Sequence, residues 1–291
     1  MPLDLLFSVD HYPRAGSKID GLGLCVQGGG PVPNVMVGLR RLGYSTALIT
    51  AVADDLTGRI GVDDLKAEKV GHQFIVTKEG TSDTAVGFVE QGSGRRTMVL
   101  NRIIHVMPGD ITTTQYPIPS VIHLDGRDLD ACIKLAKWGR KAGATITFDI
   151  GSRRNDVSPI FPLVDHLVVA DRYAFPFTKT RSARRAIERL RKYCPGTVVV
   201  TEGIRGSTGF ENGRFAFQPA FKVRNVDTTG AGDAFHTGYI YGMLNGFDLP
   251  DRLHFGAAVA ALKCTGMGAR TGIPTLREIQ RFLKKDPPVY A

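Results

Sequence analysis

The chain has 291 residues, 43% of them hydrophobic, and a formal net charge of +9. This length is enough to bury one large core. No apolar run approaches the roughly 18–20 residues that cross a bilayer, and no basic region precedes Leu3, so we expect neither a membrane segment nor a secretory signal. The four widely spaced cysteines form no Cys-x-x-Cys pair, which favours reduced thiols in a cytoplasmic protein over disulfides or a zinc site.

The positive charge raises the alternative of a nucleic-acid partner. Its densest cluster lies within residues 181–192, where basic residues alternate with apolar ones at helical spacing. That spacing predicts an amphipathic helix with a solvated basic face. No known nucleic-acid motif accompanies it, so we expect no nucleic-acid partner. The charge equally suits a protein that binds nucleotides and anionic sugars.

The predicted elements begin with a strand over residues 4–10 and a looser strand over 18–26. A Gly/Pro turn at 27–34 leads into a helix that ends at Gly43. A buried strand over 46–53 and a helix starting at 54–58 follow. Period-two alternation over 84–91 and 95–101 then predicts a β-hairpin with one exposed face.

From about residue 110 the pattern alternates between strands and helices. Strands are expected at 121–124, 145–149, 167–170, 197–201 and within 215–226. Helices are expected at 129–142, 181–193, from 233 onward, at 252–264 and at 275–284. Such alternation predicts an α/β fold with a mostly parallel central sheet and helices on both faces.

The most informative stretch is Asp227-Thr228-Thr229-Gly230-Ala231-Gly232-Asp233, followed by a small-residue apolar run. Glycines let backbone N–H groups converge, and together with a helix N-terminus these groups can hold an anion. A carboxylate beside such an anion hole can take the proton of an attacking hydroxyl, which is a phosphoryl-transfer arrangement. The alternative is an ordinary Gly-rich turn with an N-capping Asp.

This stretch resembles the C-terminal signature of the ribokinase/PfkB family of carbohydrate kinases. The resemblance implies that Asp233 is the catalytic base and also contacts the substrate, and that Gly230, Ala231 and Gly232 form the anion hole. A second region, with Gly29, Gly30 and Asn34 ahead of Leu39-x-x-Leu42-Gly43, resembles the N-terminal signature and implies sugar binding. Together they imply one ribokinase-like α/β domain over 1–291, with a small β-sheet lid formed by about 12–27 and 82–105.

Residues 4–13 resemble the ketohexokinase-like branch of the family, where an aspartate at the position of Asp4 binds sugar hydroxyls. The family normally has about nine more residues before this aspartate, so either the native start lies further upstream or the first strand is short. Other stretches resemble bacterial sulfofructose kinases and imply that Lys18, Asn101 and Arg127 reach the anionic end of a substrate. For Lys18 and Asp4, plain surface charge is the alternative.

For the nucleotide, Thr201-Glu202-Gly203-Ile204-Arg205-Gly206 resembles the family loop that lies along the ATP phosphates. The resemblance implies nucleotide contacts for Thr201, Gly203, Arg205, Gly206, Thr228, Gly230, Gly232, Ala257, Ala261 and Cys264. A tight turn and a small-residue helix packed on a sheet are the alternatives for 201–206 and for the alanines. The Asn-x-x-Glu pair that helps the family order Mg²⁺ is missing: Ala170 and Ala174 stand there, with Asp171 as a partial substitute. Asp149 and Asp227 are the other carboxylates to consider, and the metal ligands stay unassigned.

The sequence thus predicts a kinase that uses ATP and Mg²⁺ to phosphorylate a keto-sugar or a related, possibly anionic, sugar. The resemblance also implies a homodimer formed through the lid. Two alternatives stay open: a nucleoside kinase, and a catalytically silent sugar-binding regulatory protein.

Overall fold

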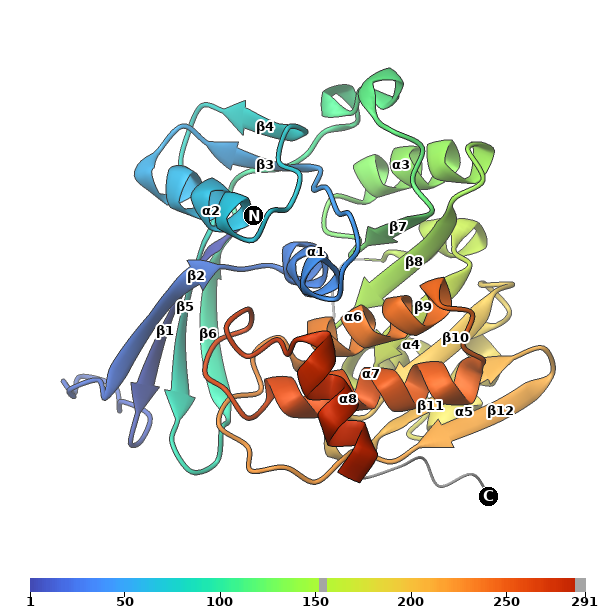
Figure 1. Cartoon of the computed structure of the whole chain (residues 1–291). Coiled ribbons are helices and arrows are strands. Elements are labelled where there is room, and N and C mark those ends of the chain that lie inside the picture. Colours follow the sequence, from blue (N-terminus) through green and yellow to red (C-terminus); the bar gives the residue numbers. More distant parts are fainter. Residues whose placement is uncertain (152–155, 286–291) are drawn as a thin grey trace. The chain divides into compact units, whose positions relative to one another are not determined.

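The computed structural model describes residues 1–151 and 156–285 (Figure 1). The chain divides into two compact units. Unit 1 comprises residues 1–105, 222–241 and 258–291, and unit 2 comprises residues 106–221 and 242–257. Each unit has its own sheet.

The main sheet of unit 1 has four strands in the order β2-β1-β5-β6. They are β1 (Leu3–Val9), β2 (Gly23–Gly28), β5 (Thr84–Glu90) and β6 (Arg96–Asn101). β1 pairs with β5 in parallel, whereas β2 and β6 pair antiparallel at the two edges. The hairpin predicted from alternation is therefore confirmed.

The two segments predicted to form a lid supply three strands of this sheet, and β1 supplies the fourth. β1 was not predicted to be part of the lid, but its described partners are β2 and β5. One face of this sheet carries a row of aliphatic side chains, because Val26, Leu5, Val86 and Val99 are directly opposite one another in register. Next to this row, Phe7 and Phe88 stack with ring centroids 6.2 Å apart.

Unit 1 also contains a small parallel pair of strands, β3 (Thr50–Ala53) and β4 (Ile75–Lys78), with α1 (Pro31–Arg41) and α2 (Leu56–Ala67). The strand β4 was not predicted. Asp55 caps α2 by accepting the N–H of Gly58 at 2.7 Å, as its position before an apolar-periodic run suggests. Side chains from these elements and from the adjoining chain share one core: Met1, Val37, Leu48, Val52, Leu65 and Val70.

The sheet of unit 2 has six strands in the order β12-β11-β10-β9-β8-β7. The strands β7 (Val121–Leu124), β8 (Thr145–Ile150), β9 (His166–Ala170) and β10 (Thr197–Thr201) are parallel. The hairpin of β11 (Ser207–Glu211) and β12 (Arg214–Gln218) continues the sheet in antiparallel fashion. The predicted mostly parallel α/β sheet is thus confirmed, and β11 is an addition that the sequence did not reveal.

The helices of unit 2 include α3 (Leu129–Lys141), α4 (Asp171–Thr178) and α5 (Ala183–Leu190). α4 was not predicted, because Pro176 interrupts the helical pattern of a short segment. Two helices have residues in both units, α6 (Ala231–Leu244) and α7 (Leu249–Lys263). The last helix, α8 (Leu276–Lys285), belongs to unit 1. Four short 3₁₀ turns, at Pro108–Asp110, Thr113–Gln115, Ser158–Leu163 and Gly203–Arg205, lie in the described part of unit 2.

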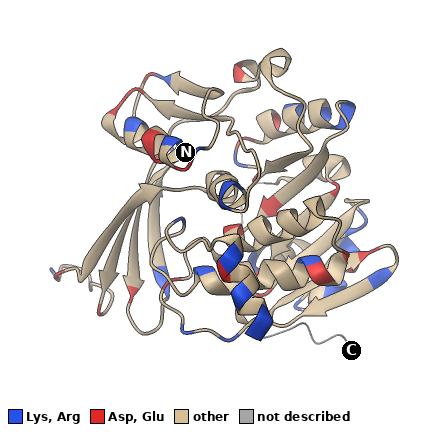
Figure 2. Cartoon of the chain, viewed as in Figure 1, with Lys and Arg blue, Asp and Glu red and all other residues tan. Residues whose placement is uncertain are grey.

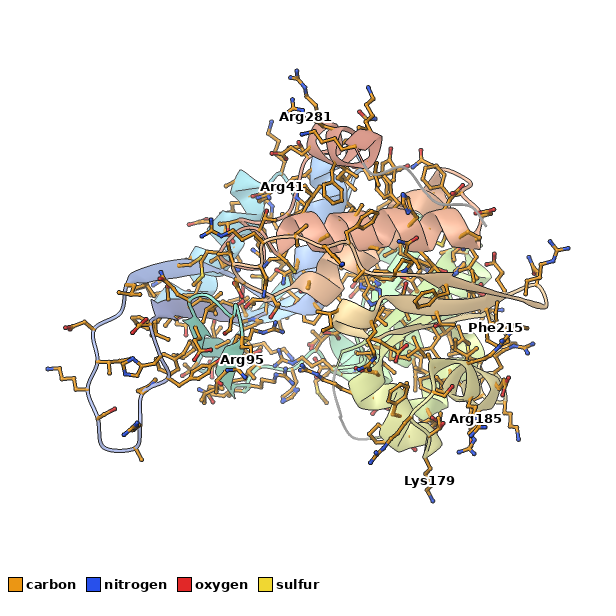
Figure 3. The ribbon with its side chains drawn as sticks, turned by 90° about the horizontal axis from the view of Figure 1, so that it is seen from below. Arg41, Arg95, Lys179, Arg185, Phe215 and Arg281 are labelled. Carbon is orange, nitrogen blue, oxygen red and sulfur yellow. The ribbon has the colours of Figure 1, made fainter. Side chains whose placement is uncertain are left out.

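The basic cluster forms α5, and several of its arginines have structural partners. Arg191 lies over the ring of Phe210 at 3.8 Å, and Arg184 over that of Phe215 at 4.3 Å. Arg185 projects away from the ribbon, as does Arg281 of α8 (Figure 3). Basic residues also occupy the last turns of α1, α3 and α8 (Figure 2), where they complement the helix dipole. These placements agree with the solvated-face interpretation of the charge.

Candidate functional site

The two signature regions meet in unit 1, where the side-chain amide of Asn34 donates to the carboxylate of Asp233 over 2.6 Å. Asn34 is buried in α1, whose entry requires Gly30 at φ +98° and is favoured by Pro31 at the first helical position. Asp233 is half-buried in the first turn of α6. The residues predicted as sugar ligand and catalytic base are therefore neighbours.

The glycines before α1 are explained by two buried charged side chains. A Cβ on Gly28 would overlap the guanidinium of Arg270, and a Cβ on Gly29 would overlap the carboxylate of Asp4. The sequence interpretation, in which these glycines let the backbone approach a sugar, is therefore incomplete: they also admit Arg270 and Asp4. Arg270 received no role from the sequence. It is 2% exposed, and only its burial, which sequence does not display, marks it as part of the site.

Asp4 is also buried, with 4% of its surface exposed. The pKa of its carboxyl is raised to about 7, mainly by burial and also by the nearby Asp233 carboxylate, and Arg270 and Arg96 limit the rise. The surface-charge alternative for Asp4 is wrong, because the side chain lies in the interior beside the Gly29 backbone. A carboxyl that titrates near neutral pH can both accept and donate hydrogen bonds to a ligand.

The turn that opens α6 contains the three residues predicted to form the anion hole. Gly230 has φ +75°, and a Cβ there would lie 2.7 Å from the Cβ of Ala269, so no other residue fits. Ala231 uses its N–H to close the turn on the carbonyl of Thr228 at 3.2 Å. Gly232 has an ordinary φ and nothing within 4 Å of its Cβ position. Gly232 therefore needs no special backbone conformation, and its absent side chain leaves open space at a helix N-terminus.

A buried ion pair between Lys263 and Asp227 holds the loop that leads into this turn. The carboxylate of Asp227 accepts the N–H of Thr229 at 2.8 Å, its hydroxyl at 2.6 Å and the N–H of Gly268 at 2.8 Å. The ammonium of Lys263 donates to the Asp227 carbonyl at 2.6 Å, and both side chains are fully buried. These contacts engage both carboxylate oxygens of Asp227, so this side chain holds the loop.

The turn of the β5–β6 hairpin contacts the chain just before the anion hole. Arg96 donates to the Thr228 carbonyl at 2.5 Å and to its hydroxyl at 3.2 Å. Asn225 donates its side-chain N–H to the Ser93 carbonyl at 2.9 Å, and the Thr228 N–H meets the Gly94 carbonyl at 3.4 Å. The hairpin thus brings the cation of Arg96 next to the anion-hole turn. Sequence reasoning missed this residue.

The three residues predicted to bind an anionic terminus come from three different segments of the chain. Lys18 is exposed in the loop that joins the far ends of β1 and β2, at the opposite end of β1 from Asp4. Asn101 pairs with Thr84 in the row next to that of Asp4, so its side chain points to the opposite face of the sheet. Arg127 belongs to unit 2, follows β7 and donates its backbone N–H to Asp125 at 3.0 Å. Within unit 1, no described contact joins Lys18 or Asn101 to Asp4 or Asp233.

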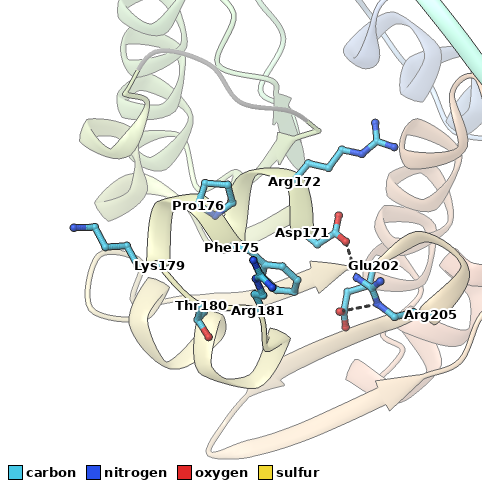
Figure 4. Close-up of a pocket in the computed structure, with 9 residues that line it drawn as sticks. All are labelled: Asp171, Arg172, Phe175, Pro176, Lys179, Thr180, Arg181, Glu202 and Arg205. Carbon is cyan, nitrogen blue, oxygen red and sulfur yellow. Dashed lines mark hydrogen bonds and ion pairs between the residues drawn. The ribbon is translucent and has the colours of Figure 1, made fainter.

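The predicted phosphate loop lies in unit 2, after β10. Gly203 and Gly206 have φ of +58° and +102°, and a Cβ on Gly206 would overlap the carbonyl of Gln218. Arg205 forms ion pairs with Asp171 at 2.8 Å and with Glu202 at 3.2 Å (Figure 4). Thr201 ends β10 opposite Ser207. The glycines are therefore required by the turn itself.

Asp171, Glu202 and Arg205 line a pocket of about 690 Å³ at the carboxyl ends of β9 and β10. Its lining residues are Asp171, Arg172, Phe175, Pro176, Lys179, Thr180, Arg181, Glu202 and Arg205. In Figure 4 the side chains of Lys179 and Arg172 extend away from the Asp171–Arg205 pair. Ligands bind at the carboxyl ends of strands in sheets of this kind, and the basic lining suits an anion.

Three residues predicted to contact the nucleotide, Ala257, Ala261 and Cys264, lie on or just after α7. Ala257 and Ala261 are buried in the helix, and Cys264 follows its end, where burial raises the pKa of the thiol. Within residues 1–151 and 156–285, no three His, Cys, Asp or Glu side chains are grouped so as to hold a metal ion. In the same ranges, no helix is both long and apolar enough to cross a membrane.

Comparison with known proteins identifies the family of this chain. The family model described as "pfkB family carbohydrate kinase" matches residues 23–276. A 5-dehydro-2-deoxygluconokinase of Clostridium perfringens is 26% identical over 288 residues, covering 90% of this chain and 85% of the relative. An uncharacterized sugar kinase of Archaeoglobus fulgidus is 31% identical over 257 residues, covering 82% and 98%.

Solved structures give the same fold. A ribokinase of Thermotoga maritima superposes with a TM-score of 0.82 at 20% identity, covering 97% of this chain and 96% of that one. An Arabidopsis thaliana ribokinase complexed with ribose and ATP gives a TM-score of 0.78 at 21% identity, with the same 97% and 96% coverage. The fold is ribokinase-like, and the chain belongs to the pfkB family of carbohydrate kinases.

Proposed function

We propose that this carbohydrate kinase transfers the γ-phosphoryl group of ATP to a hydroxyl of a keto-sugar or keto-sugar acid, with Asp233 as general base. The observation that carries the proposal is the contact between Asn34 and Asp233 at the N-terminus of α6. This contact brings together a polar side chain that can bind a sugar hydroxyl, a carboxylate and a helix N-terminus. Each is needed for phosphoryl transfer to an alcohol.

In the proposed reaction the acceptor hydroxyl gives its proton to the carboxylate of Asp233 as its oxygen attacks the γ-phosphorus. The bond from that phosphorus to the bridging oxygen breaks, and ADP leaves. The N-terminus of α6 stabilises the charge on the transferring group, with room provided by Gly232. Arg96, beside Thr228, adds a positive charge at the same end.

The acceptor we favour combines a keto group with an anionic terminus. The relatives named 5-dehydro-2-deoxygluconokinase act, by that name, on a sugar acid that carries both. The net charge of +9 is consistent with anionic ligands. Asp4 and Asn34 would bind hydroxyl groups. Lys18, Asn101 and Arg127, which no described contact joins to Asp4 or Asp233, remain our candidates for the anionic end.

For the nucleotide we propose phosphate contacts from the 201–206 loop, with Arg205 exchanging its carboxylate partners for phosphate oxygens. Thr228, Gly230 and Gly232 would lie at the transferring end, and Ala257, Ala261 and Cys264 beside the base. Mg²⁺, when bound with ATP, would neutralise phosphate charge. Asp171 follows the end of β9 and would contact the Mg²⁺ ion through water. Its ion-pair partner, Arg205, would release it on turning to the phosphates.

The test is a panel of acceptors with ATP and Mg²⁺, with ADP release as the readout. It should contain 5-dehydro-2-deoxygluconate, fructose and adenosine. We expect the keto-sugar acid to exceed fructose by about 10–100-fold in kcat/KM, since charge-assisted hydrogen bonds are each worth about 1.5–3 kcal/mol. Better turnover of adenosine would favour a nucleoside kinase. ADP release with none of them, from protein that still binds ATP, would favour a sugar-binding regulatory protein.

Single variants test which residues bind the anionic end of the sugar acid. Arg127→Ala and Lys18→Ala should lower kcat/KM for the sugar acid more than for fructose if they bind its carboxylate. Equal losses on both substrates would mean that these residues contact ordinary hydroxyls or hold the fold.

We also propose that a homodimer forms through the four-stranded sheet of unit 1. Its outer face carries exposed apolar side chains, including Leu24 at 55%, Val26 at 48% and Val99 at 69% exposure. A contiguous apolar face of this kind is typical of an association surface. Val99→Lys should convert a dimer into a monomer in sedimentation experiments, whereas Ile118→Lys, at an exposed site in unit 2, should not. A wild-type chain that sediments as a monomer at all concentrations would contradict the proposal.

A further inference from the structure

Arg270 contacts the other side of the amide that touches Asp233. Its Nε donates to Asn34 Oδ1 at 3.1 Å, and its Nη1 donates to Asp64 Oδ2 at 2.6 Å. The guanidinium also reaches the Gly29 carbonyl at 3.4 Å. Asn34, 236 positions away in sequence, is thus held between Arg270 and Asp233.

The chemistry of these partners allows only one orientation of the Asn34 amide. A guanidinium only donates hydrogen bonds, and an ionised carboxylate only accepts them. The amide oxygen must therefore face Arg270, and the NH₂ group must face Asp233. Turning the amide over would bring oxygen against carboxylate oxygen and NH₂ against the guanidinium, so both contacts would become repulsive.

Arg270 is itself held so that it cannot turn away. Asp64 accepts from Arg270 and from the Gly28 N–H at 2.8 Å, which ties the guanidinium to the end of β2. Gly28 provides the space that the guanidinium fills. Burial lowers the pKa of Arg270, but the adjacent Asp64 opposes this, so the side chain keeps a charged partner.

We infer that Arg270 is a positioning residue for the general base: by fixing the Asn34 amide, it makes Asn34 a donor to Asp233 and so fixes the carboxylate that takes the hydroxyl proton. This inference rests on the proposed function of Asp233, and it adds a residue outside both signatures. The Asp64–Arg270–Asn34 chain links α2 and the loop after α7 to the first turn of α6.

The first test needs no turnover. In protein labelled with ¹⁵N-asparagine, the side-chain NH₂ signal of Asn34 is identified by its loss in Asn34→Asp. We expect Asp233→Ala to shift this signal, because the NH₂ group loses its acceptor. Arg270→Gln should shift or broaden it too, because glutamine accepts as well as donates and no longer dictates the orientation. Arg270→Lys, which only donates, should keep it nearer to the wild-type position.

The second test is kinetic, with the best acceptor of the panel. Arg270→Gln should lower kcat by about 10–100-fold with little change in KM for ATP, and Arg270→Lys should recover part of the loss. Combined with Asn34→Ala, Arg270→Gln should add little further loss, because both remove the same donor to Asp233. If Arg270→Gln does not fold, Asp64→Asn weakens the same guanidinium from its far side and should give a smaller effect in the same direction.

Arg41 provides the matched control. It donates to the Arg270 carbonyl at 2.7 Å and to the Ile273 carbonyl at 2.9 Å, so it anchors the same loop without touching Asn34. Arg41→Gln should lower Tm but leave kcat and the Asn34 signal unchanged.

Two results would overturn the inference: an unchanged Asn34 signal in Arg270→Gln, or kcat losses that are additive with Asn34→Ala. If no acceptor is turned over by the wild type, the proposed function fails, and the Asn34 signal still decides the orientation of the amide.

Discussion

Asn34 and Asp233, 199 positions apart, are joined by a hydrogen bond of 2.6 Å from the amide nitrogen to the carboxylate. A donor this close to a carboxylate restricts its rotation. In a general base that restriction is useful, because the oxygen that takes the proton must lie within about 2.6–3.2 Å of the attacking hydroxyl. This hydrogen bond therefore joins Asn34, proposed to bind a sugar hydroxyl, to Asp233 at the helix N-terminus proposed to hold the phosphoryl group.

The two glycines of the anion-hole turn should respond differently to the same substitution. Gly230→Ala should lose about 1–2 kcal/mol or more of stability, because its φ is +75° and Ala269 fills the space. Gly232→Ala should keep or slightly raise the stability, since it lies in a helix with open space at its Cβ, yet it should lose activity. Urea unfolding and kcat measured on both variants check this. A fully active Gly232→Ala enzyme would mean that the open space does not receive the phosphoryl group.

The pKa of about 7 for Asp4 predicts a stability that depends on pH. The folded state holds the proton more tightly than the unfolded state does, so the contribution of Asp4 is fully present below pH 4 and is lost as pH rises to about 7. The rise in the pKa of Asp4, by about three, corresponds to about 4 kcal/mol at most in the free energy of unfolding. Relative to the wild type, Asp4→Asn should gain stability between pH 4.5 and 8 in urea titrations. An equal pH dependence in both proteins would show that Asp4 ionises normally.

Substrate binding should couple to the same titration. Ionised Asp4 accepts hydrogen bonds from sugar hydroxyls, so KM for the acceptor should fall as pH rises through about 7. This change should be absent in Asp4→Asn, whose KM should be high at every pH.

The Lys263–Asp227 pair is fully buried, so breaking it should be costly. Lys263→Met leaves a buried carboxylate without its cation and should cost about 3–5 kcal/mol. Lys66→Met, which breaks an exposed pair with Asp63, should cost less than about 1 kcal/mol. Similar losses in the two variants would mean that the buried pair does not hold the anion-hole loop.

The hairpin contacts predict a change in amide exchange. We expect residues 84–101 to exchange more slowly when a turned-over acceptor is added, as a lid that closes on substrate would. Arg96→Met should speed exchange in the free protein, because it removes the hydrogen bonds to Thr228. Equal exchange with and without acceptor would indicate a fixed sheet.

Local patterns were sufficient for much of the fold. Alternation around Gly92–Gly94 located β5 and β6, and the small-residue run located α6 to within two residues of its start. The sequence missed β4, β11 and α4, which are short or contain proline. Their structure depends on tertiary pairing more than on local preference.

The site was less accessible to sequence reasoning. Nothing local indicates that Arg270 is buried against Asn34, since the two are joined only in the folded chain. Likewise, three glycines in a row reveal neither which has a positive φ nor which makes room for a neighbour. Gly30 has the unusual backbone, whereas Gly28 and Gly29 make room for Arg270 and Asp4.

The central claim is tested most directly by Asp233→Asn, compared with the wild type for ADP release with the best acceptor of the panel. Asparagine keeps the size of the side chain but cannot take a proton. We predict that kcat falls by at least 10²–10⁴-fold while ATP binding, measured by calorimetry, stays within a few-fold of the wild type. A variant with near-normal kcat would contradict the assignment of Asp233 as the general base and, with it, the proposed mechanism.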